Sequence, residues 1–181
     1  MLKLNENPPV LFPEVENLSM ISGPWWIAHT KSRCEKAFAW NLATKKIGYF
    51  LPMVERIKIS GGKKRYFVLP LFPSYVFLCG NDDDCYRSRS KHLCQMIKVV
   101  DQEKLVKELK FIEKALQAKM ELDLFPQLAI GQRCRVMAGS LKGLEGVVIS
   151  QNKRARVVLE VSILGRGAIM EIDADLLELC A

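Results

Sequence analysis

The residue types best suited to chemistry in this chain are its six cysteines and two histidines. No two cysteines have the two-residue spacing of a zinc knuckle or a redox motif. With only His29 and His92 to complement them, we expect no metal site. No nucleophile–base pair or acidic dyad stands out, and Gly61-Gly62-Lys63 lacks the rest of a P-loop. We therefore expect a protein that is not an enzyme, binds no cofactor and keeps its thiols reduced.

Positive charge is the second chemical feature, and it is concentrated in the N-terminal half. Residues 31–70 contain ten Lys or Arg and two acids, a net charge of +8, against +7 for the whole chain. Residues 125–181 contain seven basic and six acidic residues and are almost neutral. A basic field of this kind fits contact with nucleic-acid phosphates, and by charge alone a solvated basic surface fits equally well.

The third feature is the aromatic segment 69–78, with the sequence LPLFPSYVFL. Pro70 and Pro73 fix φ and remove backbone donors, so a regular strand is expected only from Ser74 onward. Aromatic residues held close together in this way suit either a hydrophobic core or a docking pocket for a partner. For any one of them, ordinary burial preferences favour the core.

The elements that position these residues follow from periodicity and turn signals. Residues 1–22 are expected to form a mobile arm. An amphipathic helix is expected over 32–46, with Ser32 and Glu35 forming a capping box and Gly48 ending it. Residues 81–84 are expected to form an acidic turn, and Asp101 to cap a helix that continues to Met120. The expected strands cover 25–30, 49–59 with a break at Pro52, 65–69, 74–79 and 96–100.

The pattern changes after Phe125-Pro126, where short strands follow at close spacing with glycine turns. This spacing predicts a small five-stranded antiparallel barrel with strands at 132–138, 146–150, 155–162, 168–172 and 176–179. The fold class is therefore α+β: an N-terminal antiparallel sheet with helices packed on it over 23–120, a linker over 121–128 and a barrel over 129–181.

Four blocks of sequence resemble one known family. Residues 129–148, AIGQRCRVMAGSLKGLEGVV, resemble a KOW motif of SH3-like barrels, with glycines at 139, 143 and 146. Residues 161–172, VSILGRGAIMEI, resemble the closing part of a NusG C-terminal domain. WWIAHTKSRCEKAF at 25–38 and LPLFPSYVFL at 69–78 resemble the two signature blocks of the NusG N-terminal (NGN) domain. By these blocks, in this order, the chain resembles the NusG family over residues 25–180.

The resemblance implies a bacterial transcription elongation factor. In this family the N-terminal domain binds the clamp helices of the RNA polymerase β′ subunit through a hydrophobic depression, bridges the cleft toward the β subunit and suppresses pausing. By position, the depression would be lined by His29, Phe72, Tyr75 and Phe77, with Met96 or Ile97 from a later strand. His29 stands where family members often carry an aromatic residue, and Phe77 on its own fits a core position equally well.

The resemblance also implies further contacts. Lys31, Arg33 and Lys36 would face upstream or non-template DNA, and Lys63, Lys64 and Arg65 at a hairpin tip would act similarly. Tyr86–Arg89 would approach the gate loop of the β subunit. In the barrel, Ile163, Leu164 and Arg166 match the loop that touches the termination factor Rho or a ribosomal small-subunit protein.

Within the family, we expect a specialised paralog of the RfaH, UpxY or LoaP kind, which promotes antitermination, because SRCEK replaces the usual start of the first helix. A housekeeping NusG and a KOW-type RNA-binding protein are the alternatives, and the near-neutral barrel argues against the latter. A helical second state of the barrel is not expected, because Val157–Val161 is rich in β-branched residues. Without a long apolar run or a signal peptide, the protein is expected to be a cytoplasmic monomer that does not bind membranes.

Overall fold

The computed structural model describes residues 7–60, 63–120, 122–125, 133–137, 139–151, 154–164, 166–173 and 177–179. The chain divides into two compact units, Met1–Gln102 and Glu103–Ala181. The expected domain limits, with a linker at 121–128, stay a prediction. Among the described residues, no helix has the length and hydropathy needed to cross a bilayer.

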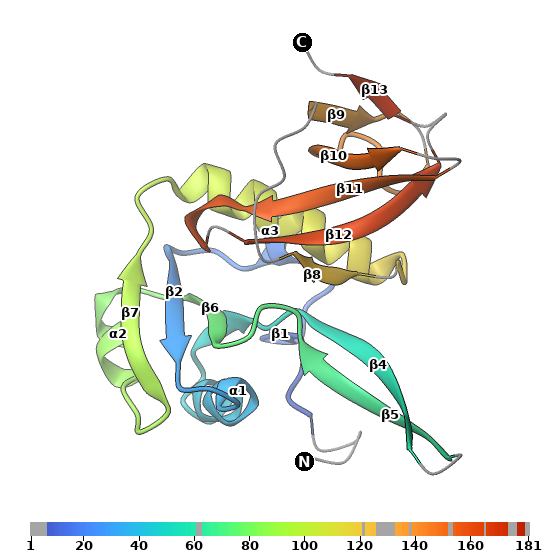
Figure 1. Cartoon of the computed structure of the whole chain (residues 1–181). Coiled ribbons are helices and arrows are strands. Elements are labelled where there is room, and N and C mark those ends of the chain that lie inside the picture. The colour runs from blue at the N-terminus through green and yellow to red at the C-terminus, as the bar shows by residue number, and fades with distance from the viewer. Residues whose placement is uncertain are drawn as a thin grey trace. The chain divides into compact units, whose positions relative to one another are not determined.

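The first unit is built on a five-stranded antiparallel sheet (Figure 1). The strands expected at 25–30 and 74–79 are confirmed, and the strand expected at 96–100 begins and ends earlier. Within the residues expected to form a mobile arm, Leu11 and Phe12 pair with β3 and Leu18 is buried. The mobility of the arm stays a prediction. In sheet order the strands are β1 (Leu11–Phe12), β3 (Gly48–Phe50), β6 (Tyr75–Cys79), β2 (Trp25–Thr30) and β7 (Leu93–Lys98).

A two-stranded hairpin extends beyond this sheet (Figure 1). It consists of β4 (Met53–Ser60) and β5 (Lys63–Pro70), paired from Met53↔Pro70 to Ser60↔Lys63. The break expected at Pro52 is present, since it lies between β3 and β4. The glycines expected to form the turn, residues 61 and 62, lie outside the described residues.

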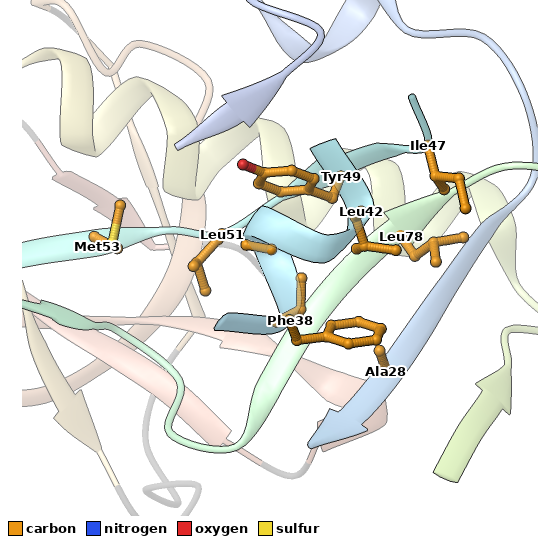
Figure 2. Close-up of a cluster of buried hydrophobic side chains, with 10 residues drawn as sticks. Ala28, Phe38, Leu42, Ile47, Tyr49, Leu51, Met53 and Leu78 are labelled. Carbon is orange, nitrogen blue, oxygen red and sulfur yellow. The ribbon is translucent and has the colours of Figure 1, made fainter. Parts of the chain in front are cut away.

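Helix α1 (Glu35–Thr44) contributes to the core on one face of the sheet. Phe38, Ala39 and Leu42 are fully buried there with Ala28 of β2 and Leu78 of β6 (Figure 2). The expected capping box with Ser32 is wrong, because Cys34 occupies the N-cap position and no side chain caps the helix. Glu35 is instead buried, and its carboxyl group accepts a hydrogen bond from the Ser74 amide.

The acidic segment expected as a turn forms a short helix, α2 (Asp82–Arg87). Asn81 is its N-cap: its side chain accepts from the Asp84 amide at 2.9 Å, and the Asp84 carboxyl accepts from the Asn81 amide at 3.1 Å. This capping box satisfies two amides of the first turn, where acidic side chains also favour the helix dipole. The run of aspartates is therefore a helix start rather than a turn.

The second unit contains nearly all of helix α3 (Gln102–Gln117) and a six-stranded antiparallel sheet. All five expected strands are present, and the sixth, β8, comes from residues expected to be linker and pairs with β12. Closure of this sheet into an SH3-like barrel stays a prediction. In sheet order the strands are β13 (Leu177–Leu179), β9 (Arg133–Val136), β10 (Glu145–Gln151), β11 (Arg154–Val161), β12 (Arg166–Asp173) and β8 (Asp123–Phe125).

Candidate functional site

Strand pairing brings four of the five expected docking residues onto one face of the first sheet. His29 lies opposite Tyr75, and Ile27 lies opposite both Phe77 and Ile97. Directly opposite residues on paired strands point to the same side of a sheet, and neighbours along a strand alternate. Ala28, Val76 and Leu78 alternate with these residues along the strands and belong to the core beneath α1. The four docking residues therefore lie on the opposite face of the sheet, turned away from that core.

Two groups of aromatic rings lie on this face, which we call the aromatic face (His29, Phe50, Phe72, Tyr75, Phe77 and Ile97). The rings of His29 and Tyr75 stack, with centroids 5.1 Å apart and an interplanar angle of 26°. Phe77 meets Phe72 edge-on at 6.0 Å and Phe50 in a tilted arrangement at 6.3 Å. Both distances are in the range preferred by interacting aromatic pairs.

Burial divides the aromatic face into a floor and an exposed part. Phe50 and Phe72 are each 1% exposed and Phe77 is 0% exposed, whereas His29, Tyr75 and Ile97 are partly exposed. Phe72 and Phe77 are packed in the interior, as the core alternative for Phe77 expects, and their docking role stays a prediction. The docking role of the partly exposed three stays a prediction.

Met96 and Ile97, which the sequence left as alternatives, lie on opposite faces of the sheet. Ile97 is paired with Ile27 and lies on the aromatic face. Met96 packs against the core beneath α1, together with Trp26. Only Ile97 of the two belongs to the candidate docking site.

The turn that leads into β6 fixes the position of Tyr75. The Tyr75 amide donates to the Phe72 carbonyl at 3.2 Å, and the Leu71 amide donates to the Pro52 carbonyl at 2.8 Å. Ser74 has a φ of 69°, in the left-handed region, directly after Pro73. A proline followed by a residue with positive φ is characteristic of the two central positions of a type II turn. The proline pattern predicted the constrained entry, but not the conformation of Ser74.

The expected nucleic-acid contacts differ in their surroundings. Lys31 and Arg33 are exposed in the loop between β2 and α1, and Lys64 is exposed on β5. Lys36 is half-buried, and its ammonium group donates to the Val68 carbonyl and the Asn7 side chain. Burial lowers the pKa of Lys36, and the neighbouring Glu35 opposes this shift. These internal acceptors hold the charged group of Lys36, and its expected DNA contact stays a prediction. Lys63 and Arg65 belong to β5, and their side chains lie outside the described residues.

A surface hollow near α2 was not expected from the sequence. It has a volume of about 660 Å³ and is lined by residues of α2, β7 and Trp26 of β2. Tyr86 and Arg89, assigned above to the β gate loop, both line it, and the Arg89 guanidinium lies 4.9 Å from the centre of the Tyr86 ring. No sequence signal marks this hollow, because it depends on α2, a segment whose sequence pattern predicts a turn.

Comparison with known proteins connects these features to one family. The family model described as "Transcription termination factor nusG" matches residues 23–157, most of the chain. The chain belongs to the NusG family. The match includes both the β2 strand that carries His29 and the β5–β6 segment that carries Phe72 and Tyr75. No curated protein matches the chain.

Two solved structures are similar to this NusG-family chain. One, titled "Domain interaction in Thermotoga maritima NusG", has 19% sequence identity and a TM-score of 0.49. The other, the MjSpt4:Spt5 complex, has 13% identity and a TM-score of 0.26. Each comparison covers 87% of this chain and 97% of the other.

In the second unit of this NusG-family chain, the expected partner-binding residues lie where β11 leads into β12. Ile163 is 43% exposed in a short 3-10 helix (Ser162–Leu164), and Leu164 is partly exposed. Arg166 begins β12, and its side chain lies outside the described residues. In the KOW-like segment, Gly139 and Gly143 have φ values of 82° and 86°, conformations that glycine adopts without a steric cost. Partner binding by these residues stays a prediction.

Proposed function

We propose that this NusG-family protein is a transcription elongation factor that binds RNA polymerase at the β′ clamp helices through its aromatic face. The observation that carries the proposal is the stacked His29–Tyr75 pair beside Ile97, partly exposed on a buried floor of phenylalanines. Aromatic side chains held by their surroundings lose little conformational freedom on binding, and such residues dominate many interfaces. Binding is the whole activity in this proposal, and no covalent chemistry is involved.

The rest of the first unit would extend this contact. Tyr86 and Arg89, on the hollow beside α2, would approach the β gate loop. Lys31, Arg33 and Lys64 are exposed and would contact phosphates of the non-template or upstream DNA. The protein would then hold both sides of the polymerase cleft and favour processive elongation.

Within the family we propose a specialised antitermination factor rather than a housekeeping NusG. The features that favour it are the SRCEK start of α1, the aspartate run of α2, and the few residues that separate α3 from the first strand of the second unit. The protein would work as a monomer in the cytoplasm, where bacterial transcription takes place. Ile163, Leu164 and Arg166 would contact Rho or a ribosomal small-subunit protein.

The proposal is tested by capture of core RNA polymerase on the immobilised full-length protein. Tyr75→Ala removes the partly exposed ring of the stacked pair, and Tyr66→Ala removes a ring that is 54% exposed on the hairpin. We expect the wild type and Tyr66→Ala to capture polymerase equally, and Tyr75→Ala to lose about 2 kcal/mol of binding free energy. Circular dichroism checks that both variants are folded.

Two outcomes would contradict the proposal. If folded Tyr75→Ala captures polymerase as well as Tyr66→Ala does, the aromatic face is not the docking site. If the wild type binds structured RNA and ignores polymerase, the protein is a KOW-type RNA-binding module and the elongation-factor proposal fails.

A further inference from the structure

The turn before β6 contains a residue that is poorly suited to its conformation. Ser74 has a φ of 69° and follows Pro73, at the turn position where glycine is the usual residue. A side chain with a Cβ adopts this left-handed conformation at a cost, and surrounding contacts must hold it there. The contacts around Ser74 therefore determine how firmly the turn is fixed.

Both backbone groups of Ser74 are held by elements outside the turn. The Ser74 amide donates to Oε1 of Glu35 at 2.6 Å, and the Ser74 carbonyl accepts from the Thr30 amide at 2.8 Å. Glu35 is the first residue of α1, and Thr30 is the last residue of β2. The turn is thus fixed from two sides, by a helix and by the end of the central strand.

The Glu35 side chain is buried away from water for this contact. It is 5% exposed, which is unusual for a carboxyl group unless a partner holds it. A short hydrogen bond from an amide to a carboxyl oxygen is among the stronger ones found in proteins. It also explains why Glu35 does not complete the capping box that the sequence pattern indicates.

We propose that Glu35 is a positioning residue for the aromatic face. By holding Ser74 in the left-handed conformation, it sets the direction in which the chain leaves Phe72 and enters β6. That direction places the Tyr75 ring against His29, with which it stacks at 5.1 Å. The inference rests on the proposed docking function, and it assigns to a buried residue of α1 the control of a ring that would meet the partner.

The alternative is that Glu35 stabilises the fold in general and has no specific effect on the turn. The two roles differ in how they depend on residue 74. Ser74→Gly makes the left-handed conformation intrinsically favourable, so the turn then needs less help from Glu35. A general structural role gives the same loss with serine or glycine at position 74.

The test is a double-mutant cycle of Glu35→Ala with Ser74→Gly, read by equilibrium binding to core RNA polymerase. In the serine background we expect Glu35→Ala to weaken binding about tenfold, the loss typical of a hydrogen bond to a charged group. Glu35→Gln keeps an acceptor oxygen and should recover most of the affinity. In the glycine background the loss caused by Glu35→Ala should fall to about twofold or less. Equal losses in both backgrounds, or no loss in either, would overturn the proposal.

A second readout does not need polymerase. Amide hydrogen exchange of the free protein should show Ser74 exchanging at least about tenfold faster in Glu35→Ala than in the wild type. The Leu78 amide, farther along β6, should keep its protection. If Glu35→Ala does not fold, Glu35→Met, which fills similar space but has no acceptor oxygen, gives the same comparison. Unchanged Ser74 exchange in a folded variant refutes the inference. If Ser74 responds as expected but no protein, wild type included, binds polymerase, the proposed function fails and the role of Glu35 in the turn stands without it.

Discussion

Burial of Cys79 gives the first unit a response to alkaline pH that can be measured at a single residue. The side chain is 4% exposed, and burial, with a smaller effect of Asp84, raises the pKa of its thiol to about 11 from an ordinary value of 9.0. Between these two pH values the unfolded chain releases a proton that the folded protein keeps. The folded state then binds more protons, so its stability must fall as the pH rises.

We therefore predict that Cys79→Ala reduces the loss of stability between pH 9 and pH 11. The measurement is the free energy of unfolding by urea at several pH values, compared as a slope so that the lost packing of the thiol cancels. Cys94→Ala is the matched control, because Cys94 is exposed. A slope that Cys79→Ala leaves unchanged would contradict the assignment of a raised pKa.

Residue-level roles were the least predictable part of the site. The choice between Met96 and Ile97 depends on strand register, and a shift of one residue would move every side chain of β7 to the other face. The Lys36 ammonium binds the Val68 carbonyl, which is 32 residues away in the sequence. Neither contact leaves a local signal, because both are created by pairing between distant segments.

At the scale of elements, α2 owes its start to one capping residue. Asn81 and Asp84 satisfy each other's backbone amides at the start of this six-residue helix, which contains no buried residue. We predict that Asn81→Ala destabilises the protein by about 1 kcal/mol, the usual cost of losing an N-cap. Asp83→Asn, at an exposed position of the same turn, should change stability by less.

Amide exchange locates this effect. The Cys85 and Ser88 amides, which donate to the Asn81 and Asp84 carbonyls, should exchange faster in Asn81→Ala while the central strands stay protected. Faster exchange throughout the sheet would instead show that Asn81 supports the whole first unit.

Most elements could be predicted because their patterns are local. The strand at 25–30, the break at Pro52 and the start of α3 after Asp101 each follow from composition and turn residues. The errors have a common cause: segments of two to six residues are too short to show a periodicity. Residues 11–12 form a strand only because β3 is beside them, and the aspartate run reads equally well as a turn or as a helix start.

At the scale of the whole molecule, the concentration of charge in the N-terminal half predicts salt-dependent binding to DNA. Each phosphate contact releases counterions, so log affinity falls linearly with log salt concentration. We predict that Lys31→Ala weakens DNA binding and reduces this slope by about one, because Lys31 is exposed. Lys36→Met should leave the slope unchanged, since the Lys36 ammonium is held by Val68 and Asn7. If both substitutions reduce the slope equally, Lys36 also contacts DNA phosphates.

The order of the sequence blocks was enough to predict the α+β class and the family, and the family is confirmed over residues 23–157. The sequence pattern did not predict the sixth strand of the second unit. Residues 123–125 fall in the expected linker, and they form a strand by pairing with β12. Long-range pairing of this kind depends on the whole sheet.

The most direct test of the central claim is site-specific photocrosslinking to core RNA polymerase. A benzophenone amino acid replaces Tyr75 in one protein and Tyr66 in another, and mass spectrometry identifies the crosslinked polymerase peptides. The account predicts crosslinks from position 75 to the β′ clamp helices and none to them from position 66. Crosslinks to the clamp helices from position 66 alone, or none from position 75 in a protein that binds polymerase, would contradict it.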